Sequence, residues 1–360
     1  MTPIRLIDLF SGAGGMTLGF CDERFCGKFE SIWALDNDNA AIRTYRENFG
    51  SHADCYDIEG WLDEKRQVPA ADVVVGGPPC QGFSLLNKRR ANDPRRALWV
   101  PFLEVVEKSG ASVFVIENVA ELFRSPELLE IETKANEMGF DIAKDVLLAA
   151  DYGVAQSRRR TVLIGYKRSL RRPPTFPPLA THSAPNMGSN LPNWLTVRDE
   201  ISDLPDPIGT EIREVDAPLN LHFGRNPTEK SKLRYRAVPP GGNRFDLQRN
   251  APEITPDCWI RKKSGGTDLF GRLWWDRPSV TIRTEFFKPE KGRYLHPIKD
   301  RPITHREAAR LMGFPDDFRF VGSKVEIARQ IGNAVPPPLA GAIGQVVAEL
   351  LGAIIERRAA

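Results

Sequence analysis

One cysteine of this sequence stands in a setting suited to covalent chemistry. Cys80 follows the strand-like run 72–75 and lies within the segment Gly-Gly-Pro-Pro-Cys-Gln-Gly-Phe-Ser at 76–84. The two prolines stiffen the backbone ahead of the thiol, and the flanking glycines leave room for a substrate and a moving loop. Because a rigidly presented thiol in a cleft is well placed for attack, we predict that Cys80 is a nucleophile.

A carboxylate stands at the expected end of a neighbouring strand. The apolar run 113–116 leads directly into Glu117. Partial burial raises the pKa of a carboxyl group and keeps a proton available for acid catalysis. We therefore predict that Glu117 is the acid partner of Cys80.

A glycine-rich segment stands where the first strand should turn into the first helix. Residues 8–15 read Asp-Leu-Phe-Ser-Gly-Ala-Gly-Gly, and such glycines let the backbone approach a ligand at a helix N-terminus. The pattern is not GxGxxG, and no Lys-Ser/Thr follows it, which weakens the nicotinamide dinucleotide and ATP interpretations. Taken alone, the segment also fits a tight turn without a ligand.

Two acidic positions follow at the ends of the next two predicted strands. Asp36 ends the second strand, where an acid can accept hydrogen bonds from ribose hydroxyls. Asp57 lies at the end of the third, where its carboxylate can take an adenine amino group while Ile58 covers the ring. Ligands of open α/β sheets bind at the carboxyl ends of strands, so this ordered set predicts a cofactor cleft.

The elements that must position these groups alternate between strand and helix. This order predicts an α/β fold with a parallel sheet and covering helices. The short predicted strands do not alternate strictly between apolar and polar residues, which fits strands buried on both faces. Besides the presumed third strand that ends at Asp57, the predicted strands span 4–10, 31–35, 73–75, 113–116, 142–147 and 161–165, and the helices 16–23, 39–49, 97–108 and 127–138.

From about residue 168 the sequence contains closely spaced prolines, and it shows little hydrophobic periodicity until about residue 269. This pattern indicates a linker and a loop-rich second domain. Thr304 with Glu307 has capping-box spacing and predicts a helix over 304–312. A small, apolar helix is predicted from Leu339 to about Ile355.

Composition narrows the class of protein. A chain of 360 residues suits two domains, and no apolar run approaches membrane-spanning length. The five cysteines are scattered without a CxxC pair, so we expect neither a disulfide framework nor a metal site. The N-terminus lacks the pattern of a secretory signal, and we expect a cytoplasmic protein.

Positive charge is concentrated in one segment. Residues 222–263 contain ten Lys or Arg against four acids, although the whole chain carries only +3. A segmental excess suits a surface that faces phosphates, and a solvated basic face is an equal alternative on this observation alone.

Taken in order, the motifs resemble those of the DNA (cytosine-5)-methyltransferases of bacterial restriction-modification type, along nearly the whole chain. The matching motifs are DLFSGAGG, Asp36, Asp57-Ile58, GGPPCQGFS, ENV at 117–119, QSRRR at 156–160 and QIGNAVPP at 330–337. The resemblance implies a Rossmann-like sheet of the S-adenosylmethionine-dependent methyltransferases and a smaller, loop-rich target-recognition domain. The implied boundaries are 1–186 for the first catalytic segment, 187–324 for the recognition domain and 325–360 for the return to the catalytic domain, where the last helix should cover the sheet near residues 6–10.

The resemblance also implies a reaction. A methyl group passes from S-adenosylmethionine to carbon 5 of a flipped cytosine in a specific duplex sequence, after Cys80 adds to carbon 6. Glu117 stabilises the ring at nitrogen 3. Arg158 and Arg160 match the two arginines of the Q-x-R-x-R motif, which hold the loop and the target, and the second binds the carbonyl oxygen of the base.

Cofactor roles are implied for a set of residues along the cleft. One departure is visible, because many members follow the acid at position 36 with an aromatic residue that covers the adenine, whereas this chain has Asn37 and leaves Phe10 and Ile58 as apolar cover. The implied cofactor-binding residues are Phe10, Gly12, Gly14, Gly15, Asp36, Asp57, Ile58, Pro79 and Asn333.

Duplex DNA is the expected partner, because a base inside the duplex must be rotated out to reach Cys80. We expect a monomer, and a cognate restriction endonuclease would act separately. The predicted DNA contacts lie in the basic loop 81–98 and in the recognition region: Gln81, Ser84, Arg89, Arg90, Arg234, Arg236, Arg261 and Lys262.

Three alternatives remain at this point. A tRNA cytosine methyltransferase shares the catalytic core, but residues 284–288 do not give its Cys-Phe-Thr signature. A non-catalytic DNA-binding protein on the same fold would not need the intact Cys80 and Glu117. A dehydrogenase would need the absent dinucleotide fingerprint.

Overall fold

The structure is a computed structural model that describes residues 3–79, 98–185, 187–261 and 263–359, with side chains as far as residue 352. The predicted nucleophile and five of the predicted DNA contacts lie outside the described residues: Cys80, Gln81, Ser84, Arg89, Arg90 and Lys262.

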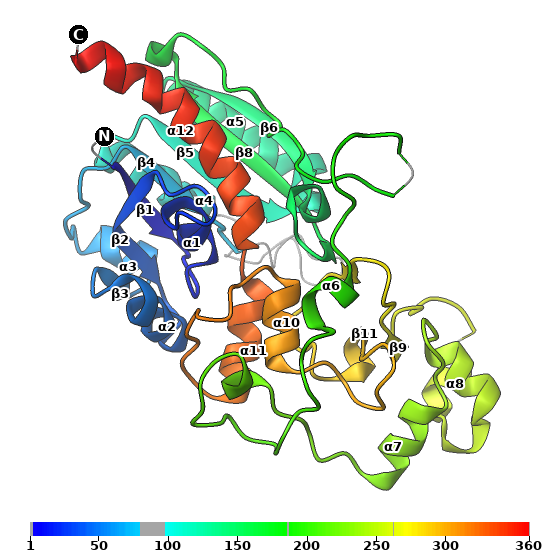
Figure 1. Ribbon diagram of the computed structural model, residues 1–360. Helices are drawn as coiled ribbons and strands as arrows, with labels where there is room; N and C mark the ends of the chain where they lie inside the picture. Colours follow the sequence, from blue (N-terminus) through cyan, green and yellow to red (C-terminus); the bar gives the residue numbers. More distant parts are fainter. Residues whose placement is uncertain (1–2, 80–97, 186, 262, 360) are drawn as a thin grey trace.

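A seven-stranded sheet forms the centre of the N-terminal part of the molecule (Figure 1). Its strands are β1 Ile4–Leu9, β2 Phe29–Asp36, β3 Ala53–Cys55, β4 Val73–Gly76, β5 Val113–Val119, β6 Phe140–Leu148 and β8 Arg159–Lys167. They lie in the order β3-β2-β1-β4-β5-β8-β6. The α/β fold class is therefore confirmed.

The direction of β8 corrects the expectation of a parallel sheet. Strands β1 to β5 pair in parallel, whereas β8 runs antiparallel to both β5 and β6. The cause is the short connection 149–158, which contains only a 3₁₀ turn and the two-residue strand β7, Gln156–Ser157. A parallel return needs a crossover of a dozen or more residues, so the chain turns back directly.

Helices cover both faces of the sheet. Helices α1 (Gly15–Cys21), α2 (Asn39–Phe49) and α12 (Pro337–Ala359) lie on one face, and α4 (Trp99–Ser109) and α5 (Pro126–Glu137) lie on the other, with α3 (Ile58–Asp63) at the end of β3. Leu6 packs with the α12 side and Leu9 with the α4 side. This two-sided burial confirms the prediction from the unalternating strands.

The last helix returns to the first strand, as the resemblance in the motifs implies. Leu339 and Ile343 of α12 share a buried cluster with Ile4 and Leu6. An added Cβ at Gly19 of α1 would lie 2.5 Å from the Cβ of Ala340, so the two helices approach closely because glycine stands there.

The region between the sheet and its return is built from short elements. They are α6 Val197–Ile201, α7 Glu229–Arg236, α8 Arg244–Asn250, α9 Asp257–Arg261, α10 His305–Leu311, α11 Lys324–Asn333, β9 Gly271–Arg272, β10 Ser279–Val280 and β11 Arg293–Leu295. Figure 1 shows α7 and α8 at the end of the molecule remote from the sheet. The loop-rich character of this region agrees with the sequence, and Thr304 and Glu307 form the predicted capping box of α10.

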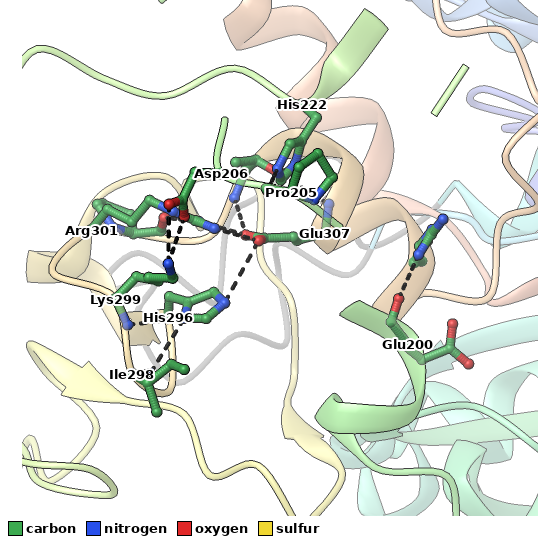
Figure 2. A network of polar contacts seen from close by, with 12 residues as sticks. Glu200, Pro205, Asp206, His222, His296, Ile298, Lys299, Arg301 and Glu307 are labelled. Carbon is green, nitrogen blue, oxygen red and sulfur yellow. Dashed lines mark hydrogen bonds and ion pairs between the residues drawn. The ribbon is translucent and has the colours of Figure 1, made fainter. Parts of the chain in front are cut away.

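Buried ionic and polar contacts fix the loop between β11 and α10 (Figure 2). Glu307 is buried and accepts hydrogen bonds from Arg301 Nη1 and Nη2 at 2.9 and 2.7 Å. His222 lies with Nδ1 3.0 Å from the Thr304 hydroxyl. Burial lowers the pKa of His296 to about 4, so this imidazole, 3.9 Å from Glu307, is neutral at pH 7.

No single helix among the described residues is long and apolar enough to cross a membrane. Helix α11 and the Pro337–Gly352 part of α12, which meet at a bend of 40°, pass the same test of length and composition only when taken together.

Candidate active site

A cavity of about 450 Å³ lies at the carboxyl ends of β1, β2, β4 and β5, closed on one side by the end of α11. The cavity brings together the predicted catalytic residues that the structure describes and every predicted cofactor residue except Gly14. Those among its lining residues are Phe10, Gly12, Gly15, Asp36, Asp57, Ile58, Pro79, Glu117, Arg158, Arg160 and Asn333.

The turn after β1 owes its shape to left-handed backbone positions. Phe10 has a φ of 55°, which is uncommon for a residue with a side chain and places it at the cavity wall. Gly14 does not line the cavity. With a φ of 90° it caps α1, and an added Cβ would lie 2.4 Å from the ring of Phe49, so Gly14 shapes the turn.

Asp36 fastens this turn to the end of β2. One carboxylate oxygen accepts from the Gly12 amide at 2.8 Å, and the other accepts from the Asp38 amide at 2.8 Å. Burial raises the pKa of Asp36. Lone pairs of both oxygens remain for a ligand's hydroxyl groups.

Asp8 is a second buried acid of the cavity that sequence reasoning missed. Its carboxylate accepts from the Thr17 hydroxyl at 2.6 Å, and that hydroxyl lies 2.9 Å from the hydroxyl of Tyr45. Burial raises the pKa of Asp8 to about 7. The signal in the sequence was an acid between the buried apolar residues Ile7 and Leu9 of β1.

The turn after β3 presents three consecutive residues to the cavity. Asp57 caps α3 by accepting from the Gly60 amide at 3.0 Å, and Ile58 is buried behind it. Tyr56, which the sequence interpretation did not select, also lines the cavity, and its amide donates to the carbonyl of Asp36 at 3.0 Å.

Glu117 lies at the far end of the cavity and pairs with Arg160. The Arg160 Nε and Glu117 Oε1 atoms are 2.9 Å apart, and both side chains are largely buried. Strand β5 positions the acid and β8 the arginine, with Val119 opposite Arg160 in the antiparallel register. The reversal of β8 thus brings this cation beside the acid.

The Glu117 carboxylate also faces the segment that leads to Cys80. An added Cβ at Gly77 would lie 3.4 Å from Glu117 Oε2. Asn118, the next residue of β5, donates from Nδ2 to the carbonyl of Pro78 at 2.9 Å. The acid and the two prolines before Cys80 are therefore held at one wall.

Arg158 donates hydrogen bonds to backbone carbonyl groups. It is buried and donates to the carbonyl oxygens of Ile282 at 3.2 Å and of Ala334 at 3.0 Å. Gln156, also buried, donates to the carbonyl of Leu311 at 3.1 Å. Both side chains tie the sheet to segments distant in the sequence.

The described DNA-contact candidates lie away from the cavity. Arg234 and Arg236 are on α7 and Arg261 ends α9, and none of them lines the cavity. Arg234 donates from Nε to the carbonyl of Ile254 at 2.6 Å, whereas Arg236 is exposed, with Nε 3.6 Å from Asp300.

The cavity offers features that fit S-adenosylmethionine. Asp36 and Asp57 supply acceptors for hydroxyl and amino groups, and Asp8 adds a carboxyl group to a wall that would face a cationic ligand. The Ser11 hydroxyl is buried in the wall without a hydrogen-bond partner among the described residues, as expected of a group that bonds a ligand. In the same part of the chain, no group of three or more His, Cys, Asp or Glu could hold a metal ion.

Comparison with known proteins shows the family of the chain. Residues 4–349 match the family of C-5 cytosine-specific DNA methylases. The chain is 36% identical to the Type II methyltransferase M1.HphI of Haemophilus parahaemolyticus, over 96% of this chain and 87% of that protein. It is 30% identical to M.AgeI of Thalassovita gelatinovora, over 96% of this chain and 99% of the relative.

A solved structure has the same architecture. The crystal structure of a protein assigned as a DNA modification methyltransferase encoded within an E. coli prophage superposes with a TM-score of 0.71 at 27% identity, covering 97% of this chain and 99% of that one. The resemblance noted in the motifs is thereby confirmed. The chain belongs to the C-5 cytosine-specific DNA methylases, the S-adenosylmethionine-dependent enzymes of restriction-modification type that methylate cytosine in DNA.

Proposed function

We propose that this enzyme methylates carbon 5 of one cytosine in a specific duplex sequence, by covalent addition of Cys80 to carbon 6 of a base rotated out of the helix. The observation that carries the proposal is the single cavity that joins Asp36 and Asp57 to Glu117 and Arg160, with Pro79 in its wall one residue before Cys80. Cofactor and target base would meet there.

The residues divide the chemistry between them. S-adenosylmethionine, when bound, supplies the electrophilic methyl group. The Cys80 thiolate adds to carbon 6, which makes carbon 5 nucleophilic. Carbon 5 would then take the methyl group and release S-adenosylhomocysteine, and the loss of the carbon 5 proton to solvent would expel Cys80 as a thiolate. Glu117 holds a proton at ring nitrogen 3, and Arg160, held beside it at 2.9 Å, binds the carbonyl oxygen of the base.

The cofactor is proposed to lie along the first two strands of the cavity. Asp36 would accept from the ribose hydroxyls and Asp57 from the adenine amino group. Phe10 and Ile58 would cover the base, while Gly12, Gly15, Pro79 and Asn333 line the remaining walls and Gly14 shapes the turn. Arg158 acts as a positioning residue through its bonds to the carbonyls of Ile282 and Ala334.

Duplex DNA is proposed to bind across the mouth of this cavity. Rotating a base out costs a few kcal/mol, which contacts to the phosphates must offset. We assign target recognition to 187–324 and catalysis to 1–186 with 325–360. The proposed contacts are Gln81, Ser84, Arg89, Arg90, Arg234, Arg236, Arg261 and Lys262.

The biological setting follows from the relatives. Both named relatives are bacterial Type II methyltransferases. We propose that this enzyme acts as a monomer on DNA in the bacterial cytoplasm, and that a cognate restriction endonuclease acts separately on the unmethylated site.

A covalent trap tests the mechanism. Duplex DNA containing 5-fluorocytosine should capture the wild-type enzyme in the presence of S-adenosylmethionine, because the fluorine blocks the release of Cys80. Cys80→Ala should neither form this complex nor transfer methyl groups, while Cys258→Ala, at an exposed position outside the cavity, should do both. Methyl transfer by Cys80→Ala at the wild-type rate would refute covalent catalysis.

A further inference from the structure

Tyr56 is an aromatic residue of the cavity that lies between two proposed cofactor residues. It stands directly before Asp57, and its amide donates to the carbonyl of Asp36 at 3.0 Å, so its backbone is anchored to the end of β2. Among the described lining residues, Phe10 and Tyr56 are the aromatic ones.

A charged pair in the turn after α3, Glu64 and Arg66, holds the Tyr56 ring in one orientation. The Tyr56 hydroxyl donates to Glu64, and Arg66 Nε lies 2.7 Å from the other oxygen of the same carboxylate. The Arg66 guanidinium lies over the ring, 4.0 Å from its centroid. Trp61 meets the ring edge-on, with centroids 5.9 Å apart. The ring is therefore oriented before any ligand arrives.

The position of the guanidinium determines which surface a ligand can use. Arg66 covers one face of the ring, which leaves the opposite face and edge for contact. A cation over one face also withdraws electron density from the other, which favours stacking with an electron-rich purine. The hydroxyl is engaged with Glu64, so the contribution of Tyr56 to the cavity is its ring.

Asn37, the residue that follows Asp36, does not supply an aromatic ring to the cavity. Asn37 lines the cavity with an exposed, short polar side chain and offers no aromatic surface. Its carbonyl oxygen lies 3.8 Å from the sulfur of Cys55, the residue before Tyr56, so positions 37 and 56 belong to adjoining turns.

We propose that Tyr56 is a cofactor-binding residue whose ring covers the purine of S-adenosylmethionine, and that Glu64 and Arg66 are positioning residues for that ring. This inference rests on the proposed function of the cavity. It assigns the aromatic cover of the base to the turn after β3 instead of the turn after β2.

Calorimetric titration with S-adenosylhomocysteine tests the assignment without requiring turnover. Tyr56→Ala should weaken binding about tenfold, since stacking of a base on an aromatic side chain contributes about 1–3 kcal/mol. Tyr56→Phe should stay within about threefold of wild type, because it keeps the ring. Arg66→Met should give an intermediate loss. Asn37→Trp placed in the Tyr56→Ala background should recover part of the missing affinity.

Two controls separate the possible causes of a loss. Tyr166 is a half-buried tyrosine on β8 outside the cavity. The Tyr166→Ala variant should bind S-adenosylhomocysteine as wild type does. Thermal melting without ligand shows whether Tyr56→Ala is folded. Wild type that fails to bind would overturn the proposed function itself. Wild type and a folded Tyr56→Ala that bind equally well would overturn only the role of Tyr56.

Discussion

At the scale of single residues, the acids at strand ends were predictable and the groups beside them were less so. Asp36 ends β2, and Glu117 lies two residues before the end of β5; the apolar runs that precede both acids are visible in the sequence. Asp8 and Tyr56 were missed, because one lies inside a strand and the other has an ordinary sequence context. Their places in the cavity depend on packing with Thr17 and Arg66, which sequence spacing does not encode.

Arg160 should contribute to engagement of the target base and not to the affinity for the cofactor. Arg160→Ala removes the cation 2.9 Å from Glu117 but leaves the hydrogen bonds of Asp36 and Asp57 in place. We expect catalytic turnover to fall at least about a hundredfold while the Kd for S-adenosylhomocysteine changes less than about threefold. Equal losses in both measurements would contradict this role.

Asp8 should make stability depend on pH. Its pKa is about 7 in the folded protein against 3.8 as its ordinary value, so the folded state holds the proton more tightly. Stability from this group is present below about pH 4 and is lost as the pH rises to about 7, by up to roughly 4 kcal/mol. Urea unfolding of Asp8→Asn should show a flatter profile than wild type across this range, and parallel profiles would count against it.

At the scale of elements, local capping was predictable and strand direction was not. The Thr304 capping box is a short-range pattern, whereas the reversal of β8 depends on how far the chain must travel after β6. The same limit applies to the loop of Figure 2, whose buried contacts join residues far apart in sequence, such as His222 and Thr304.

Glu307, the buried acid at the start of α10, should contribute more to the free energy of unfolding than an exposed acid does. Glu307→Ala would leave the Arg301 guanidinium, which is mostly buried, without its partner, at a cost of about 3 kcal/mol. Burial raises the pKa of Glu307, but the hydrogen bonds and charge of Arg301 together with other contacts outweigh it, so the pKa lies below its ordinary value. The stabilisation therefore holds above the ordinary carboxyl pKa and fades as the pH falls. Urea unfolding against Glu290→Ala, at an exposed site, measures the difference, and similar costs for the two variants would disprove the role.

At the scale of the whole molecule, distant segments converge on β7, which carries Gln156, and on Arg158, which links β7 to β8. Their bonds reach Ile282, Leu311 and Ala334, so the sheet, the loop-rich region and the return segment are held together there. The order of these motifs is visible in the sequence. The carbonyl partners of Arg158 became apparent only with the chain folded, because backbone acceptors carry no residue signature.

The segment of excess positive charge, residues 222–263, should contribute to DNA affinity by contacting the phosphates of the duplex. Replacing Arg234, Arg236 and Arg261 with Gln should reduce the slope of log binding constant against log salt by as much as about 2.7, because each neutralised phosphate accounts for about 0.9 of that slope. The matched control replaces Arg5, Lys108 and Lys134, which lie on the sheet domain outside the cavity, and should leave the slope unchanged. Equal slopes for all three proteins would refute the interface.

The central claim is methylation of cytosine at carbon 5 in a defined sequence, with Cys80 as the nucleophile. Bisulfite sequencing of DNA from a methylation-free host that expresses the chain measures this directly. The account predicts protection of one cytosine within one recurring sequence, and no protection when Cys80→Ala is expressed at the same level. Protection that persists in the Cys80→Ala strain, or no protected cytosine with the folded wild-type enzyme, would contradict it.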